Sequence, residues 1–387
     1  MFKIKTLNKI SNYGLDKFNP NTFAHGEDLN NADAVMVRSA SMHDMELEPD
    51  LKAIARAGAG VNNIPVDDCS KKGIVVFNTP GANANAVKEL VIAGMLLCSR
   101  KIVPSMEWLK TIKGEGENVP KLVEKGKSAF AGPELKGKKL GVVGLGAIGV
   151  LVANAARHFG MDVYGYDPYM SVDSAWEISR SIKHAESLNE IYENCHYISI
   201  HAPLNDGTKH MINTEVINTM ADGVRILNFS RAALVDNSDM IEALAAGKVS
   251  AYVTDFPTHD LIGVEGVVAI PHLGASTPES EDNCALMAAE QLIDFLQNGN
   301  IKNSVNLPDA SMPKVGDKRL CVIHDNVPNV IAQISSALSS QNINIEHMLT
   351  KSKNEYAYSI FDVVGGSLDG IEDKIEPING VIRLRLL

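Results

Sequence analysis

The chain has 387 residues, of which 45% are hydrophobic and 21% charged, and its net charge is −11. This composition is ordinary for a globular protein of two or three domains, while the acidic balance argues against nucleic-acid or anionic-membrane partners. The five scattered cysteines, none in CxxC spacing, predict a reduced, cytoplasmic protein without disulfides or a metal site. Residues 1–10 lack a secretory apolar core, and the longest apolar run, 93–98, is too short to span a bilayer.

Apolar strand patterns alternate with helical patterns along most of the chain. Residues 85 to about 102 show a long helical pattern, and the polar stretch 103–135 reads as an extended excursion rather than core. Because apolar strands joined by helices are typical of parallel sheets covered on both faces, we expect an α/β protein. The expected strands lie at residues 2–7, 32–39, 74–80, 139–144, 161–166, 196–203, 224–229, 249–256 and 267–272.

The character of the chain changes after a long amphipathic helix expected at 278–299. A Pro-containing link at 307–317 leads into residues 318–387, which read β-α-β-β-α-β. This order is the split-βαβ, ferredoxin-like plan. The region holds no catalytic cluster, so a regulatory or assembly role is favoured.

The most specific motif is the glycine loop GLGAIG at residues 144–149, between an apolar strand and a helical pattern. Gly144 permits the tight turn, Gly146 lets a pyrophosphate approach the backbone, and Gly149 lets helix and strand pack closely. Helix N–H groups would hold the phosphates. Asp167, at the end of the next strand, would bind both ribose hydroxyls and repel a 2′-phosphate, which favours NAD over NADP. The alternative is that these glycines merely punctuate an α/β turn.

Three later strand ends carry residue types that hydride transfer requires, and such ends form the ligand-binding edge of an open parallel sheet. Arg231 can hold a carboxylate bidentately and polarise a carbonyl oxygen. His272 can take a hydroxyl proton while hydride leaves the same carbon. Asp255 could accept a hydrogen bond from the nicotinamide carboxamide, or simply cap a turn.

Several motifs resemble those of the D-isomer-specific 2-hydroxyacid dehydrogenases: the glycine loop, LNFSRAALVD, VTDFP, IPHLGASTPES and AGAGVNNIPVDDCSKKGIVVFNTPGANANAVKEL. The C-terminal region resembles an ACT domain. The resemblance implies a doubly wound, Rossmann-type NAD domain inserted in a flavodoxin-like substrate domain, followed by a ferredoxin-like ACT domain. The implied ranges are 1–90 with 276–306 for the substrate domain, 91–275 for the NAD domain and 317–387 for the ACT-like domain.

The family's catalytic set is Arg, Glu and His, and Arg231 and His272 match the first and last. The acid is ambiguous, because DFPTHD stands where the family has DVFxxEP. Without a gap Asp260 takes the place of the Glu, whereas aligning the Phe-Pro pair puts His259 there. Only Asp260 can orient the imidazole as a carboxylate, so it is the preferred candidate. The motif and the resemblance together imply cofactor contacts at Gly144, Gly146, Ala147, Ile148, Gly149, Asp167, His201, Ala202, Pro203, Thr208, Phe229, Ser230, Arg231, Asp255, His272, Gly274 and Ala275.

Substrate and effector positions also follow from the resemblance. A loop resembling one that holds the substrate carboxylate, an Arg-Ser pair suited to a phosphate and one helix residue imply substrate contacts at Ala59, Gly60, Val61, Arg38, Ser39 and Asn85. The alternative for the loop is an ordinary turn without a ligand, and the alternative for Arg38 is an ordinary charge at the end of a strand. In the ACT-like region His324, Asn326 and Asn344 match serine-binding positions. Asn329 stands where the family often has Gly, so a purely dimer-forming domain is an equal interpretation.

Within the family, the resemblance is strongest to the branch that oxidises D-3-phosphoglycerate with NAD to 3-phosphohydroxypyruvate, the first step of L-serine biosynthesis. Two alternatives stay open: a dehydrogenase for an unphosphorylated D-2-hydroxy acid such as lactate, glycerate or glyoxylate, and a non-catalytic NAD(H) sensor. The implied partners are the small-molecule substrate, a possible serine effector and further copies of the chain, as a homodimer or homotetramer.

Overall fold

The computed structural model describes residues 1–316 and 318–387, so that residue 317, the expected start of the ACT-like domain, lies outside the described residues. The chain forms two compact units, Met1–Ala82 with Pro278–Leu387 (the first unit) and Asn83–Thr277 (the second unit). The expected boundary at 90/91 falls inside helix α3 (Ala84–Ser99). That helix stays whole within the second unit because its apolar side chains join that unit's core.

The second unit is built on seven parallel strands in the order β12-β11-β10-β9-β6-β7-β8. This doubly wound order reverses between β6 and β9, the place where such sheets bind ligands. Two separate apolar clusters accompany the sheet, as expected for strands buried on both faces. The strands are β6 (Lys139–Val143), β7 (Asp162–Tyr166), β8 (Lys183–His184), β9 (Tyr197–Ile200), β10 (Val224–Asn228), β11 (Val249–Thr254) and β12 (Val267–Ala269).

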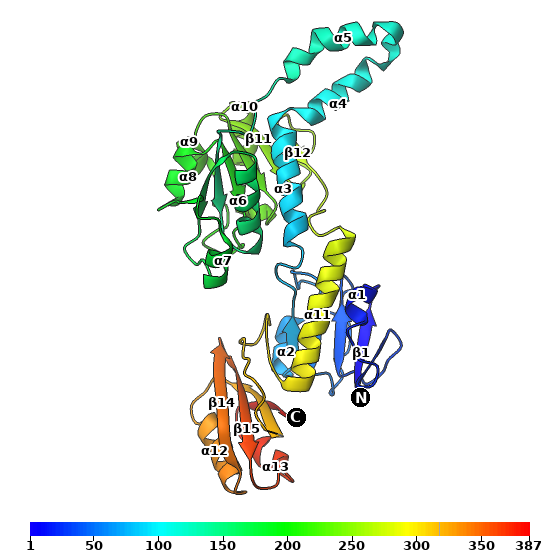
Figure 1. The fold of residues 1–387 in the computed structure, drawn as a ribbon, viewed down its shortest axis with the longest axis vertical. Helices are drawn as coiled ribbons and strands as arrows, with labels where there is room; N and C mark the ends of the chain where they lie inside the picture. Colours follow the sequence, from blue (N-terminus) through cyan, green and yellow to red (C-terminus); the bar gives the residue numbers. More distant parts are fainter. Residues whose placement is uncertain (317) are drawn as a thin grey trace. The chain divides into compact units, whose positions relative to one another are not determined.

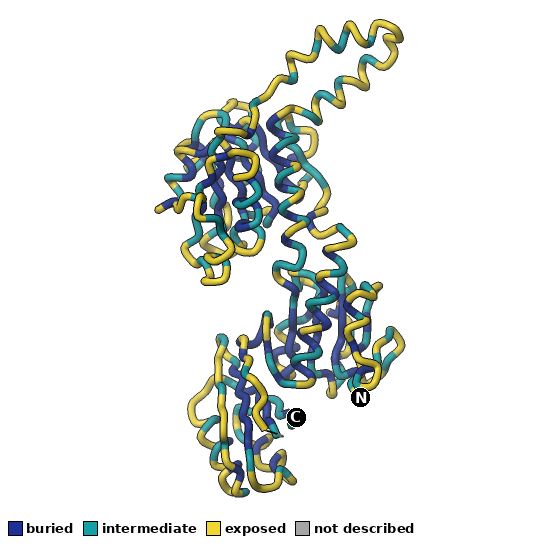
Figure 2. The backbone as a smooth tube through the Cα atoms, viewed as in Figure 1, coloured by how far each residue is buried: buried dark blue, intermediate teal, exposed yellow. Residues whose placement is uncertain are grey.

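Helices connect these strands and cover the sheet (Figure 1). Figure 2 shows the central strands, β6, β9, β10 and β11, as deeply buried, whereas the edge strands β8 and β12 have no buried residue. Among the described residues, no helix of the protein is long and apolar enough to cross a membrane. Besides α3, the helices around the sheet are α6 (Ala147–His158), α7 (Val172–Glu177), α8 (Leu188–Asn194), α9 (Thr214–Thr219), α10 (Asn237–Ala245) and the short η3 (Ala232–Leu234).

Four short helices after α3 form an arm that projects from the rest of the second unit (Figure 1). The helix expected to reach residue 102 ends at Ser99, because Lys101 adopts a left-handed conformation with φ 48°. No residue of the arm helices is buried, in agreement with the expected excursion (Figure 2). Trp108 and Phe130 hold its two limbs together, with ring centroids 5.3 Å apart. The helices are α4 (Ile102–Thr111), η1 (Lys113–Asn118), α5 (Val119–Gly126) and η2 (Lys127–Phe130).

The first unit opens with a five-stranded parallel sheet in the order β2-β1-β3-β4-β5, the flavodoxin-like order. Its core includes the apolar face of the long helix α11 (Pro278–Asn298), which returns to this sheet from the far end of the chain. The other elements are β1 (Phe2–Leu7), α1 (Asn12–Leu15), β2 (Phe23–Gly26), β3 (Ala34–Val37), β4 (Ala53–Arg56), α2 (Val66–Lys71) and β5 (Val75–Phe77).

The C-terminal domain of the first unit has the expected βαββαβ order and an antiparallel sheet, β14-β15-β13-β16. One face of the sheet packs on its two helices. The other face, through Tyr358 and Ile360, shares a core with Phe295 and Leu296 of α11. The elements are β13 (Lys318–Asp325), α12 (Val330–Ser339), β14 (Asn344–Lys353), β15 (Tyr356–Val364), α13 (Glu372–Ile375) and β16 (Val381–Leu386).

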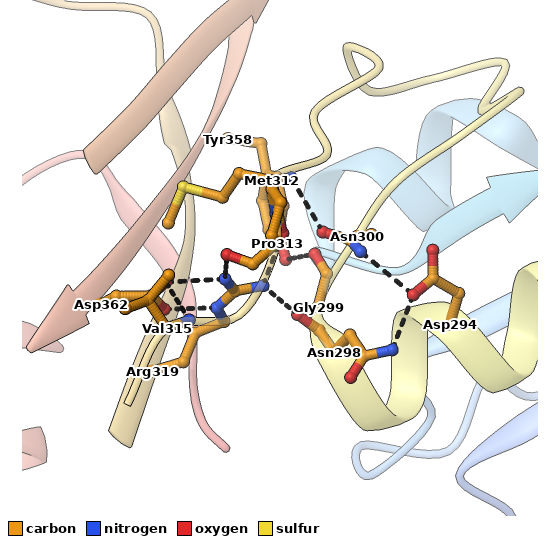
Figure 3. Close-up of polar contacts among 10 residues, drawn as sticks. All are labelled: Asp294, Asn298, Gly299, Asn300, Met312, Pro313, Val315, Arg319, Tyr358 and Asp362. Carbon is orange, nitrogen blue, oxygen red and sulfur yellow. Dashed lines mark hydrogen bonds and ion pairs between the residues drawn. The ribbon is translucent and has the colours of Figure 1, made fainter. Parts of the chain in front are cut away.

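A fully buried arginine fastens this domain to the end of α11 (Figure 3). Arg319 donates from Nε and Nη2 to the two carboxylate oxygens of Asp362, at 2.5 and 2.8 Å. Its remaining donors reach three backbone carbonyls, of Asn298 at 2.7 Å, Pro313 at 2.9 Å and Met312 at 3.3 Å. The guanidinium thus satisfies all its donors while joining strand, linker and helix end.

We expect Asp362→Asn to destabilise the protein strongly, because it leaves the buried guanidinium without a counter-charge. Breaking one side of a buried ion pair costs about 3–5 kcal/mol. Urea unfolding followed by circular dichroism measures this loss. Glu107→Gln is the matched control, since the Lys110–Glu107 pair is exposed on the arm and should contribute about 0–1 kcal/mol. Equal effects of the two substitutions would contradict the expectation.

Candidate functional site

The glycine loop forms a cradle at the reversal point of the second unit's sheet. Gly144 has φ 92°, and a Cβ there would lie 2.7 Å from the backbone of His201, so only glycine fits. A Cβ on Gly149 would lie 1.9 Å from the Gly144 carbonyl oxygen, whereas Gly146 has no heavy atom within 4 Å of its Cβ position. Helix α6 starts here without a side-chain cap, so its first N–H groups face an open, uncrowded loop. This cradle fits a dinucleotide pyrophosphate.

Asp167 lies at the end of β7, beside the same loop. Its Oδ2 accepts from the Leu145 N–H and its Oδ1 from the Tyr169 N–H, both at 2.8 Å. These two bonds fix the carboxylate next to the glycine turn, where a ribose would follow the pyrophosphate. Each oxygen keeps a further lone pair for a ribose hydroxyl.

The turn after β10 presents Arg231, and a buried asparagine shapes it. Asn228 is fully buried; it donates to the Arg231 carbonyl at 2.9 Å and accepts from the Ser230 N–H at 3.2 Å. Ser230 Oγ donates to the Ile200 carbonyl at 2.8 Å, which ties the turn to the end of β9. The Arg231 side chain is exposed at this edge. Phe229 is buried in the core, so its side chain serves packing.

Asp255 is the buried carboxylate of the site, with a side chain 1% exposed and an Oδ1 that lacks a hydrogen-bond partner among the described residues. Burial raises the pKa of Asp255, while the charges of His272 and Arg231 and the Gly274 N–H act in the opposite direction. The structure therefore gathers Arg231, Asp255 and His272 at one edge. The exposed His272 ring lies 4.7 Å from the Phe256 ring.

Among the described residues, no hydrogen bond or ion pair joins Asp260 to His272. The Oδ1 of Asp260 lies 3.1 Å from Nδ1 of His259, the residue that competes with it for the place of the family's acid. His259 is 99% exposed at its side chain. The short loop that follows β11 thus holds both candidates side by side, and neither is fixed by a buried contact.

The segment after β9 contains the other expected cofactor-lining residues. His201 Nε2 is 2.8 Å from Ser199 Oγ, and its buried Nδ1 has no partner in the described part of the chain. Burial lowers the pKa of His201 to about 4, so the ring is neutral at neutral pH. Thr208 Oγ1 donates to the Pro203 carbonyl at 2.6 Å and closes this turn.

In the first unit, the expected substrate residues converge at the carboxyl edge of its sheet. Arg38 follows β3, and the loop 57–62 follows β4. Asn8, after β1, accepts from the backbone N–H groups of Ser39 and Ala40 and so fixes the Arg-Ser turn. Arg38 Nη2 lies 2.5 Å from Glu281 Oε1 of α11. Asn85 belongs to the second unit, where it hydrogen-bonds Glu89 and Lys88 of its own helix.

The expected effector residues do not gather within one chain. His324 is buried, between Ser359 Oγ and its neighbour's carbonyl, and Asn326 bonds Asn354 at the β14–β15 turn. Asn344 pairs with Val364 at the opposite end of the sheet. Asn329 has φ 74°, a left-handed conformation that Asn adopts almost as Gly does, so the turn forms without the family's glycine.

Comparisons with known proteins agree with this geometry. The family described as D-isomer specific 2-hydroxyacid dehydrogenase, NAD binding domain, matches residues 92–274. A D-3-phosphoglycerate dehydrogenase of Bacillus subtilis is 31% identical over 95% of this chain and 71% of its own length. The chain belongs to the D-isomer-specific 2-hydroxyacid dehydrogenase family.

Two further relatives extend the comparison. The D-3-phosphoglycerate dehydrogenase of Methanocaldococcus jannaschii is 35% identical over 80% of this chain, which spans 58% of that protein's length. The NAD⁺-bound 3-phosphoglycerate dehydrogenase of Entamoeba histolytica superposes with a TM-score of 0.59 and 29% identity, covering 79% of this chain and 98% of its own. The second unit of this dehydrogenase is therefore an NAD-binding domain.

Three side chains that hold the expected site residues in place were not expected from the sequence. Asn228 and Asn8 hold the turns that present Arg231 and Arg38, and Glu281 pairs with Arg38 from 243 positions away. For Asn228 and Asn8, the sequence signal that could have identified them is a polar residue at the end of an apolar strand or directly after it. For Glu281 there was none, because the pair depends on how α11 returns to the sheet.

Substitutions at two glycines distinguish an effect on folding stability from an effect on cofactor binding. We expect Gly146→Ala to fold normally yet bind NAD weakly, because its Cβ meets only empty space that the pyrophosphate must approach. Gly149→Ala should destabilise the domain as well, since its Cβ would overlap a backbone carbonyl. Thermal unfolding and NAD titration by calorimetry measure the two properties. Normal NAD affinity in Gly146→Ala would contradict the cradle.

His201 makes stability depend on pH in a defined window. Its folded pKa of about 4 lies below that of an unfolded histidine, so the unfolded chain binds more protons and the free energy of unfolding falls as pH drops from 6.5 toward 4. Between pH 7 and pH 5 we expect a loss of roughly 1–2 kcal/mol from this group. Urea unfolding at both pH values measures it. His201→Gln should flatten the dependence; an unchanged slope would refute the assignment.

Proposed function

We propose that the chain oxidises D-3-phosphoglycerate to 3-phosphohydroxypyruvate with NAD, the entry step to L-serine. The observation that carries the proposal is the match to the Bacillus subtilis phosphoglycerate dehydrogenase over 95% of this chain. Arg38 supports it, because a strand-end guanidinium suits a phosphate group. The buried, free cysteines are compatible with a reducing cytoplasm.

The residues at the edge of the NAD-binding domain divide the proposed reaction between them. NAD, when bound, supplies the acceptor for the hydride that leaves C2. His272 takes the proton of the C2 hydroxyl, and Arg231 binds the carboxylate and the oxygen that becomes a carbonyl. Asp255 accepts from the nicotinamide carboxamide through its unpartnered Oδ1. We assign Asp260 as the residue that orients His272, which requires it to exchange its contact with His259.

An unphosphorylated D-2-hydroxy acid is the second candidate substrate. The observation that favours it is the Arg38–Glu281 pair, because a carboxylate 2.5 Å from the guanidinium already neutralises the cation that a phosphate would use. Under the phosphoglycerate reading the dianionic phosphate must compete with Glu281 for Arg38. The substrate comparison below separates these readings.

We further propose that the C-terminal domain is an ACT-type regulatory domain that takes a small amino acid such as serine. The βαββαβ topology and the left-handed turn at Asn329 support this. Because Asn344 lies at the far end of the sheet from Asn326, a site that uses both needs two chains. A homodimer or homotetramer also accounts for the exposed apolar side chains of Met106 and Leu109 on the arm.

His272→Gln should lower kcat by about 10²–10⁴-fold, because the hydroxyl proton loses its acceptor, while NAD binding is retained. NADH absorbance at 340 nm and NAD calorimetry give the two readouts. Asp260→Asn and His259→Gln form a matched pair: a large kcat loss in only one of them identifies the residue that orients the imidazole. Full turnover of His272→Gln would contradict the proposed mechanism, whereas absence of turnover by the wild-type protein on all the acids tested would return the NAD-sensor interpretation.

Arg38→Gln tests the phosphate assignment directly. A charge-assisted hydrogen bond contributes about 1.5–3 kcal/mol, so KM for 3-phosphohydroxypyruvate should rise about 10- to 100-fold while KM for hydroxypyruvate stays nearly constant. Reduction rates with both acids, and with pyruvate and glyoxylate, provide the comparison. If wild type prefers the unphosphorylated acids, the alternative substrate class is correct.

A further inference from the structure

A cavity of about 390 Å³ lies at the junction between the C-terminal domain and residues 49–52 of the first unit. The cations Lys52, Arg383 and Arg385 line it, together with the acids Asp50 and Glu376. The side chains that line this cavity thus carry more positive than negative charge, in a chain whose net charge is −11. The cavity bridges two parts of the first unit that are far apart in sequence.

Both arginines lie on the face of strand β16 that packs against the rest of the first unit, since their register partners are Ile323 and Cys321 of that core. Arg383 donates to the backbone carbonyls of Leu51 and, at 2.8 Å, of Pro49. These two bonds hold the fork in place and leave three of its five N–H donors unused in the described contacts.

Arg385 is fixed in the same way. It donates to the carbonyls of Phe295 at 3.2 Å and Leu296 at 3.0 Å, in the last turn of α11, and its guanidinium lies 4.3 Å from the centre of the Phe295 ring. The residue is only 8% exposed. Carbonyls at a helix C-terminus offer a partial negative charge of about one half, which does not balance a full cation.

Arg319, at the same junction, is an arginine whose hydrogen-bond donors and charge are all satisfied (Figure 3). All its donors are used, and Asp362 neutralises its charge. By contrast, in the described part of the chain neither the half-buried Arg383 nor the buried Arg385 forms an ion pair with a carboxylate, although buried charges such as that of Arg385 are ordinarily paired. Burial lowers the pKa of Arg383 and repulsion from Arg385 lowers it further, while the charge of Asp50 acts in the opposite direction.

We propose that this cavity binds a small oxyanion, a carboxylate or phosphate group, between Arg383 and Arg385. Guanidinium forks with free N–H donors bind such groups bidentately. Lys52 also lines the cavity, but Asp33 Oδ1 lies 2.6 Å from its Nζ and neutralises it, so the two guanidiniums carry the site. The bound anion supplies the missing counter-charge and joins the C-terminal domain to the N-terminal sheet.

The site is separate from the proposed substrate site and does not depend on the proposed function. Lys52 directly precedes β4, whereas the loop 57–62 and Arg38 follow the ends of β4 and β3. Parallel strands place these positions at opposite edges of the sheet. An anion at one edge therefore does not occupy the other, and substitutions can address the two sites independently.

The test is isothermal titration calorimetry of the full-length protein with inorganic phosphate and, in a separate series, with succinate. We expect saturable binding at this site in wild type and in Arg38→Gln, and at least tenfold weaker binding in Arg383→Gln. Lys351→Gln is the charge control, because it removes one exposed cation from β14 of the same domain. The stronger of the two probes identifies the oxyanion.

Glu376→Gln keeps the proposal testable if Arg383→Gln loosens the domain, as judged by circular dichroism. Removing this acid from the cavity wall should tighten binding of the same probe several-fold, a gain that unfolding cannot produce. Absence of saturable binding in wild type, loss of all binding in Arg38→Gln, or equal affinities in wild type, Arg383→Gln and Glu376→Gln would each overturn the proposal.

Discussion

The proposed site of this dehydrogenase depends on one constraint: all the strands of a parallel sheet end at the same edge of that sheet. In the second unit that edge gathers the glycine loop, Asp167, Arg231, Asp255 and His272 from segments spread over more than a hundred residues. The backbone polar groups of the strands are satisfied inside the sheet, so the turns that follow them are free to present side chains and N–H groups. The sheet thus fixes the positions of the turns, and the turns carry the side chains and N–H groups of the proposed site.

Sequence patterns predicted those parts of the fold whose causes are local. A glycine that needs a left-handed φ, an apolar run of strand length and an acid at the next strand end are all properties of neighbouring residues, and Gly144 and Asp167 lie where these patterns placed them. The ferredoxin-like order of the C-terminal domain was readable for the same reason. Helix ends were less readable: nothing in the composition around Lys101 marks the left-handed residue that ends α3.

What the sequence could not provide were contacts made between distant segments. Glu281 meets Arg38 only because α11 returns to the first sheet, and Asp260 contacts His259, the adjacent residue that competes with it for the place of the family's acid. Asn344 was grouped with Asn326 by resemblance, yet strand register puts them at opposite ends of one sheet. Such relations are set by packing and register, which a linear pattern does not encode.

The hydrogen bonds that dock the C-terminal domain use backbone acceptors almost throughout. Arg319, Arg383, Arg385 and Tyr358 all donate to main-chain carbonyls of the first unit or its linker. Every residue type carries the same carbonyl, so these hydrogen bonds depend on the path of the chain rather than on the identity of the side chains that the acceptors carry. Substitutions along the outer surface of α11 can therefore accumulate over evolution without weakening the joint, and correlated changes between the two partners should be scarce there.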